Sequence, residues 1–283
     1  MRGRLAVALA VGATACIAAG ETRHPASAGV LARYDLASPP QDRWELPKDL
    51  AELSGLALAR GGRLFAHGDE RAVVFELDPA GHRVVKRFEL GRPAARGDFE
   101  GIAVVDQRVF LVTSDGVLYE APEGADGEAV EFVTHATGAG RSCEVEGLEY
   151  EPETRSLLLA CKTPRVAPLK GRLTILRWSL ERGALDPDPR FSVPVEGRLG
   201  SGDVHLSGVT REPGTGHYLV IAARENLIAE LSSTGEVLAA VSLPSALHPQ
   251  AEGLALAPDG SLLIGNERKS KGSTGTLSIY RPR

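Results

Sequence analysis

The sequence predicts an all-β fold, a β-propeller of five four-stranded blades. A short motif centred on glycine recurs five times, with its glycines 46, 46, 61 and 45 residues apart at Gly55, Gly101, Gly147, Gly208 and Gly253. Each copy is followed by short apolar runs that Gly, Pro and Asp turns separate, with no helical periodicity. Units of about 45 residues with four such runs are typical of propeller blades.

The motif predicts the inner strand of each blade. Its copies are Leu53-Ser54-Gly55-Leu56-Ala57, Phe99-Glu100-Gly101-Ile102-Ala103, Val145-Glu146-Gly147-Leu148-Glu149, Leu206-Ser207-Gly208-Val209-Thr210 and Ala251-Glu252-Gly253-Leu254-Ala255. A sixth blade is the alternative, and it would have to come from the 61-residue interval. We favour five blades because residues 167–173 and 183–189 of that interval resemble enlarged loops.

The chain ends before the fifth copy has a fourth strand. Residues 30–36 near the N-terminus resemble the fourth strands of other copies, such as residues 85–90. We therefore expect residues 30–36 to pair in the last blade and close the ring, because closure removes an exposed sheet edge.

The N-terminus has the pattern of an export signal, so we divide the chain into a leader (1–28) and a propeller domain (29–283). Two arginines precede an apolar run, Leu5–Ala15, which is too short to span a bilayer. Cleavage before Cys16 would make a lipoprotein anchored through that cysteine, whereas cleavage after Ala28 would release the chain. Both alternatives predict a periplasmic or secreted protein.

Export makes a disulfide bond between Cys143 and Cys161 feasible. A hairpin centred on Pro152 would place the two cysteines opposite each other. Directly opposed residues of an antiparallel pair are close enough for such a bridge. We predict the disulfide, with two reduced thiols as the alternative.

The repeat also gathers polar residues at one end of the channel. The start of the first strand and the end of the second strand lie on the same face of a propeller. The first strands bring the carboxylates Asp98, Glu100, Glu144, Glu146 and Glu252. The second strands end near Asp69, Glu70, Asp115, Lys162, Arg224, Glu225 and Glu267, and His205 is the only histidine that we place on this rim.

Carboxylates that converge in this way repel one another unless a cation compensates them. Hard oxygen ligands suit Ca²⁺, so we predict a divalent-cation site formed by the first-strand carboxylates and a ligand-binding rim formed by the others. The alternative is that the carboxylates only build the blades, through bonds to backbone amides and basic side chains.

Composition narrows the function classes. The formal net charge is −5, which argues against a nucleic-acid partner because phosphate binding needs basic patches. No phosphate-binding loop, HExxH motif or dinucleotide fingerprint occurs. We expect a monomer that binds a small ligand or an envelope protein.

The Ser-Gly and Glu-Gly copies, together with Gln250-Ala251-Glu252-Gly253-Leu254 and Asp259-Gly260, resemble the SdiA-regulated (YjiK-like) bacterial propeller family. The resemblance covers residues 30–280. Wider relatives include the esterase-like phytase propellers, so it implies calcium binding and, as an alternative function, calcium-dependent phosphoester hydrolysis. A third alternative is a protein-interaction scaffold.

Overall fold

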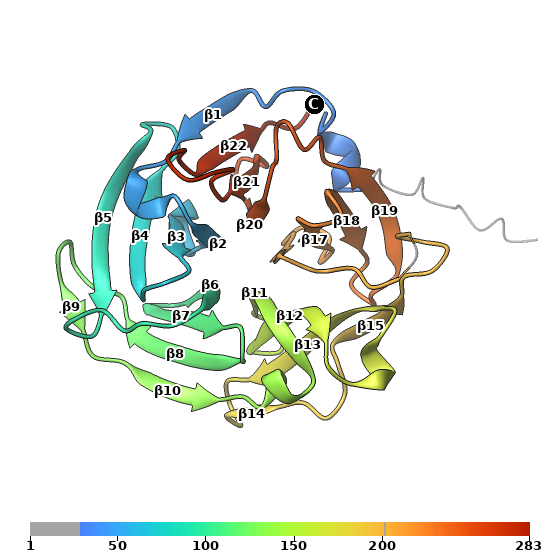
Figure 1. Ribbon diagram of the computed structural model, residues 1–283, viewed down its shortest axis with the longest axis horizontal. Helices are drawn as coiled ribbons and strands as arrows, with labels where there is room; N and C mark the ends of the chain where they lie inside the picture. Colours follow the sequence, from blue (N-terminus) through green and yellow to red (C-terminus); the bar gives the residue numbers. More distant parts are fainter. Residues whose placement is uncertain (1–28, 201) are drawn as a thin grey trace, which may run out of the picture.

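The chain forms a ring of five small sheets around a central axis (Figure 1). The computed structural model describes residues 29–200 and 202–283. The predicted leader, residues 1–28 with Cys16, lies outside the described residues. Among the described helices, none has the length and apolar character needed to cross a bilayer. The five-bladed prediction is confirmed, and the long third interval does not add a sixth blade.

Each blade begins at the axis and runs outward, one antiparallel strand after another (Figure 1). The inner strands are β2 (Leu53–Leu58), β6 (Phe99–Val105), β11 (Cys143–Glu151), β16 (Gly208–Arg211) and β20 (Ala251–Leu256). The second strands are β3 (Leu64–Gly68), β7 (Arg108–Thr113), β12 (Ser156–Pro164), β17 (Tyr218–Ala222) and β21 (Leu262–Asn266). The third strands are β4 (Val73–Asp78), β8 (Val117–Pro122), β13 (Arg172–Ser179), β18 (Leu227–Leu231) and β22 (Thr276–Tyr280).

The outer strands vary more than the inner ones in length and in number from blade to blade. They are β5 (Arg83–Leu90), β10 (Val133–Ala136), β14 (Ala184–Leu185) with β15 (Phe191–Pro194), β19 (Val237–Ser242) and β1 (Asp42–Glu45). A further short strand, β9 (Ala129–Val130), pairs in parallel with β5 of the first blade. The 3₁₀ turns are η1 (Leu31–Arg33), η2 (Lys48–Leu50), η3 (Arg60–Gly62), η4 (Ala139–Arg141) and η5 (Ala167–Leu169).

The N-terminal part of the propeller closes the ring, but not through the predicted segment. Strand β1 pairs with β22, so the closing strand is residues 42–45 rather than residues 30–36. Residues 30–36 contain η1 instead, because the buried carboxylate of Glu230 accepts hydrogen bonds from the amides of Val30 and Leu31, both at 2.9 Å. A carboxylate that satisfies free amides stabilises a helical turn more than an extended strand.

The predicted disulfide is wrong, because both cysteines are free thiols. In the hairpin of β11 and β12, Cys143 lies opposite Pro164 and Cys161 lies opposite Val145, since the tight turn joins Glu151 to Ser156. The thiols still interact: a hydrogen bond with Cys143, followed by burial, raises the pKa of Cys161. They pack as buried thiols between two blades.

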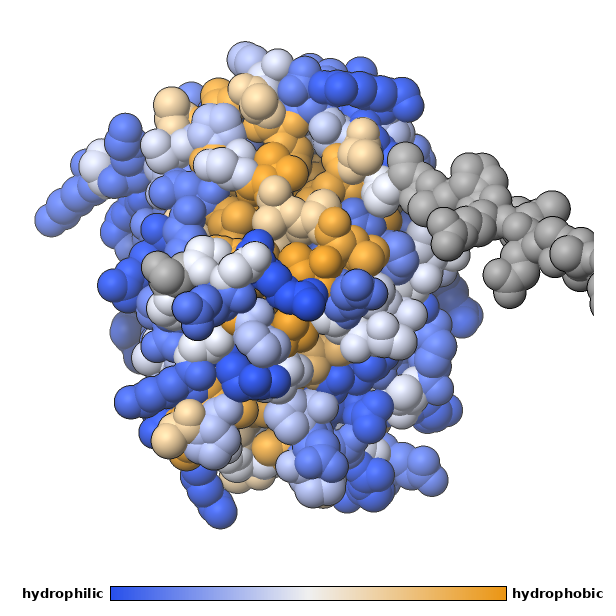
Figure 2. All heavy atoms as spheres, turned by 90° about the vertical axis from the view of Figure 1, so that its right-hand side faces the viewer, coloured by the Kyte–Doolittle hydropathy of each residue, from blue (hydrophilic) through white to orange (hydrophobic). Residues whose placement is uncertain are grey.

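The apolar core lies between neighbouring blades rather than along the axis. One cluster, for example, joins Phe110 and Leu118 of the second blade to Leu148 and Leu157 of the third. At the circumference, Figure 2 shows apolar side chains at the surface on the side of the molecule that carries β19. Leu238 of that strand is 44% exposed.

The axis itself is closed by glycines. A Cβ atom on Gly101 would lie 2.7 Å from the backbone nitrogen of Leu148 and 2.9 Å from the carbonyl carbon of Gly147, in the next blade. A Cβ atom on Gly208 would lie 2.9 Å from the side chain of Ile221 in its own blade and 3.1 Å from the carbonyl oxygen of Glu252 in the fifth blade. The space left on the axis is about 10 Å³, room for at most one water molecule. The two mouths of the channel are therefore separate sites.

We predict that Gly101→Ala destabilises the fold by about 1–3 kcal/mol, because the added methyl group meets backbone rather than a flexible side chain. Urea unfolding monitored by circular dichroism measures the change. Gly214→Ala is the matched control, since only the flexible side chain of Glu212 lies near its added Cβ, at 3.2 Å. Equal stability of Gly101→Ala and wild type would contradict the axial contact.

Candidate functional site

At one mouth of the channel a β-bulge repeats from blade to blade. In the second blade Phe99 pairs with Thr113 and Gly101 with Val112, which leaves Glu100 as the extra residue. The same irregularity occurs at Ser54 and Glu252, and a related one occurs around Glu146. Bulges re-aim side chains and are common next to binding sites. In four of the five blades they direct the residue before the axial glycine toward the mouth.

Three of these residues are glutamates that lie close together. We call Asp98, Glu100, Glu144, Glu146, Glu252 and Lys162 the acidic mouth. Burial, followed by the charge of Glu146, raises the pKa of Glu100 to about 9. Burial and then Glu146 raise the pKa of Glu252 to about 8. At neutral pH both groups therefore hold a proton when no added cation is present.

Lys162 is the internal cation of the acidic mouth. Its ammonium group contacts the carboxylate of Glu146 and lies 3.8 Å from Glu144 Oε1. Burial opposes its charge, but the carboxylates of Glu146, Glu100 and Glu144 outweigh burial and raise the pKa of Lys162. Burial raises the pKa of Glu146, although Lys162 counteracts part of this shift.

Glu252 is linked to Glu267 of the rim through the side chain of Gln250. Gln250 Nε2 donates a hydrogen bond to Glu252 Oε1 at 2.9 Å and also contacts Glu267. Burial, and then the charge of Asp69, raises the pKa of Glu267, whereas a hydrogen bond with Glu252 lowers it. Glu267 thus extends the acidic mouth toward Asp69, as the sequence predicts.

The remaining predicted rim residues form separate groups. His205 Nδ1 lies 2.7 Å from Glu225 Oε1, while Arg224 Nη1 lies 3.2 Å from His205 Nε2. The arginine can only donate, so in this contact His205 Nε2 is the acceptor. Asp115 instead turns back to bond Thr113.

Glu70 lies in a neighbouring groove of about 290 Å³ that Asp69, Glu52 and Arg268 also line. Arg268 pairs with Glu52 there. The predicted rim residues therefore form three groups, which are the acidic mouth, the contact of His205 with Glu225 and Arg224, and the groove that contains Glu70.

The acidic mouth does not form a ready-made chelating cage. Within residues 29–200 and 202–283, no three His, Cys, Asp or Glu side chains lie close enough to share a metal ion. The glutamates are near enough to shift one another's pKa but do not converge on one point.

Two polar residues at the opposite mouth of the channel, Glu149 and Thr210, were not predicted from the sequence. The repeat does contain an indication of them, because the other three blades have Ala at the same position, two residues after the axial glycine.

No protein-family model matches the sequence. Solved propeller structures do resemble the fold. Glutaminyl cyclase of Myxococcus xanthus has a TM-score of 0.57 at 18% identity, covering 86% of this chain and 94% of its own. The PQQ-bound aldose sugar dehydrogenase of Streptomyces coelicolor has a TM-score of 0.55 at 14% identity, covering 87% and 100%.

The calcium-binding protein regucalcin of Agrobacterium tumefaciens has a TM-score of 0.51 at 13% identity, covering 87% and 96%. These three similar structures are two enzymes and a calcium-binding protein. At these identities the likeness establishes the propeller fold alone.

We predict that Lys162→Met destabilises the protein by about 2–3 kcal/mol at pH 8, because it leaves buried carboxylates without their cation. This loss of stability is smaller than for a fully buried ion pair, because the Lys162 side chain is 35% exposed. Thermal or urea unfolding measures it.

The double variant Lys162→Met/Glu146→Gln should regain part of the stability, and Lys170→Met at an exposed lysine is the control. A double variant no more stable than Lys162→Met would contradict the pairing.

Proposed function

We propose that this protein binds a cation at the acidic mouth, and that the cation is Ca²⁺. The observation that carries the proposal is the burial of Glu100, Glu146 and Glu252, from three different blades, around a single lysine ammonium group. Carboxylate oxygens are hard ligands, and Ca²⁺ accepts six to eight of them in flexible geometry.

Carboxylate oxygens are suitable ligands for a cation, but the glutamates lie too far apart to share one ion. They would have to move closer together when the ion binds. Glu100, Glu146 and Glu252 would hold the ion, with Asp98 and Glu144 at its periphery. A bound divalent charge would replace the protons on Glu100 and Glu252 and weaken the contact between Lys162 and Glu146. Bound water would complete the coordination, as is common for Ca²⁺.

Two similarities support this proposal without establishing it. The repeats resemble the SdiA-regulated propellers and their phytase-like relatives, for which calcium binding is expected. Regucalcin, whose fold is similar, is a calcium-binding protein. We also propose that the protein acts outside the cytoplasm, which rests on the leader-like sequence of residues 1–28.

The geometry favours cation binding over phosphoester hydrolysis. A phosphate would need basic groups at the mouth, but the two predicted ones, Lys162 and Arg224, and the neighbouring Arg268 are engaged. Lys162 contacts Glu146, Arg268 contacts Glu52, and Arg224 contacts His205. Docking of another protein on the outer surface stays a prediction.

Calcium titration tests the proposal directly. We expect Ca²⁺ to raise the melting temperature of the wild type, since a ligand at 100 times its dissociation constant stabilises the native state by about 2.7 kcal/mol. Glu146→Gln should lose most of this rise. Asp115→Asn removes a carboxylate from the same rim outside the acidic mouth and should keep it. Equal responses of wild type and Glu146→Gln would overturn the proposal.

The raised pKa values predict that the cation competes with protons. Calcium affinity should increase from pH 6 to pH 9, because the pKa values of Glu252 and Glu100 are about 8 and about 9. Calorimetry in two buffers of different ionisation enthalpy should show proton release on binding. A pH-independent affinity would argue against Glu100 and Glu252 as ligands.

Without calcium the stability should change in the opposite direction. The folded pKa of Glu100 lies above its ordinary value of 4.5, so the folded state binds more protons than the unfolded state. The free energy of unfolding contributed by this group therefore falls as pH rises from about 4.5 to about 9. Urea unfolding of wild type and Glu100→Gln at pH 6 and pH 9 checks this, with the variant less pH-dependent.

A further inference from the structure

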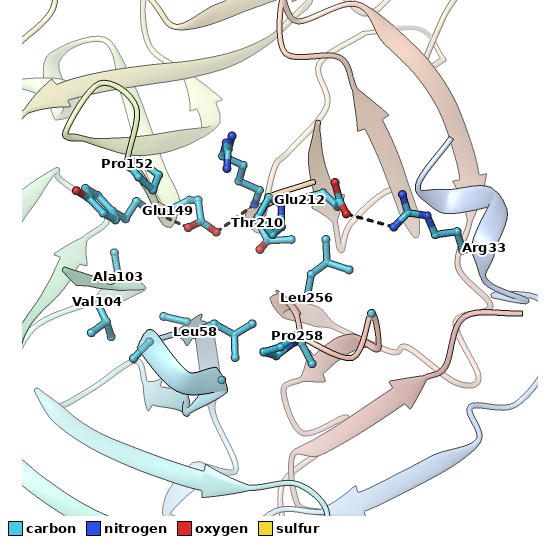
Figure 3. Close-up of a pocket in the computed structure, with 18 of the residues that line it drawn as sticks. Arg33, Leu58, Ala103, Val104, Glu149, Pro152, Thr210, Glu212, Leu256 and Pro258 are labelled. Carbon is cyan, nitrogen blue, oxygen red and sulfur yellow. Dashed lines mark hydrogen bonds and ion pairs between the residues drawn. The ribbon is translucent and has the colours of Figure 1, made fainter. Parts of the chain in front are cut away.

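The mouth opposite the acidic mouth holds a cavity of about 370 Å³ (Figure 3). The ends of the inner strands of all five blades line it. Its walls are largely apolar, with Leu58, Ala103, Val104 and Leu256 among them. The volume lies within the range of small-molecule sites, which combine apolar walls with a few polar groups.

The polar groups are Glu149 and Thr210, and both depart from the repeat. Two positions after the axial glycine, the first, second and fifth blades have Ala57, Ala103 and Ala255. The third and fourth blades have Glu149 and Thr210 at the same position. Three blades show that alanine suffices to build the strand there, so the structure of a blade does not require these two side chains.

The two side chains act as a pair across adjacent blades. Thr210 hydrogen-bonds the carboxylate of Glu149. The carboxylate also accepts hydrogen bonds from the backbone amides of Tyr150 at 2.9 Å and Arg211 at 3.3 Å. These donors fix its orientation, and Figure 3 shows Glu149 beside Thr210, with Leu256 next to Thr210 and Leu58 across the cavity.

Within residues 29–200 and 202–283, Glu149 is the carboxylate of this cavity that forms no ion pair. Arg33 pairs with Glu212 at 3.2 Å, and Arg211 pairs with Glu153, which lies outside the cavity lining, at 2.7 Å. The charge of Arg211 also acts on Glu149 and lowers its pKa. Burial raises the pKa of Glu149 to about 7, although its hydrogen bonds with Thr210 and the backbone counteract the shift. A cationic group beside Glu149 would stabilise its ionised form.

We propose that this cavity is a second binding site, for a small molecule with an apolar body and one protonated amine that pairs with Glu149. The apolar walls receive the body of the ligand, and the oriented carboxylate receives the ammonium group. Because the axis is closed at the glycines, this site is distinct from the acidic mouth and does not depend on the cation proposed there.

The probe is benzylamine, with benzyl alcohol as its neutral counterpart, and calorimetry or NMR titration measures binding. We expect wild type to bind benzylamine at least tenfold more tightly than benzyl alcohol, since charge-assisted hydrogen bonds are about twice as strong as neutral ones. Glu149→Gln should remove this preference. Affinity for benzylamine should rise between pH 5.5 and pH 8, as Glu149 loses its proton while the amine stays charged.

Two further variants test whether benzylamine binds in this cavity or at the acidic mouth. Leu58→Trp fills the cavity without altering its charge, so it should abolish binding even if Glu149→Gln folds poorly. Glu100→Gln changes only the acidic mouth and should bind benzylamine as wild type does. Undiminished binding to Leu58→Trp, or loss of binding in Glu100→Gln alone, would overturn this site.

Discussion

The contact that the rest of the structure depends on is the close approach of the inner strands at the axis. A Cβ atom on Gly101 would meet the backbone of Leu148 at 2.7 Å, a distance that no side chain tolerates, and one on Gly208 would meet the backbone of Glu252 at a tight 3.1 Å. Glycine is the residue that permits backbones to come this near. A ring of only five blades brings its inner strands closely together, so the spacing of the glycines and the number of blades are two consequences of one constraint.

The same contact creates the acidic mouth. Where the strands converge, four blades insert an extra residue next to the glycine, and the resulting bulge points that residue to the mouth. Serine at this position bonds the backbone, as when the Ser207 hydroxyl donates to the carbonyl oxygen of Ala251 in the next blade at 2.7 Å. Glutamate in the same place buries a carboxylate near others, which costs free energy that Lys162 offsets only in part. Costs of this kind are typical of functional positions.

The sequence contains enough information for the blades and for one face of the channel, because both follow from a short local repeat. Glu100, Glu146 and Glu252 could be placed together from their position before the glycine. The closing strand could not, since residues 30–36 turn into η1 through the carboxylate of Glu230, about 200 residues away in the chain. The register of Cys143 and Cys161 depends on the position of the turn, which joins Glu151 to Ser156 and which hydrophobic alternation does not reveal.

Strand β11 differs from the other inner strands because it carries a carboxylate to each mouth. Glu146 faces the acidic mouth and Glu149 faces the opposite cavity, with the axial Gly147 between them. Since the axis admits no ligand, molecules bound at the two ends cannot meet. Any coupling between them would have to pass through the protein, and β11 is the shortest covalent route, with only Gly147 and Leu148 separating the two glutamates. Gly147 has a φ of 117°, which favours glycine and holds the bulge that sends the two side chains to opposite ends.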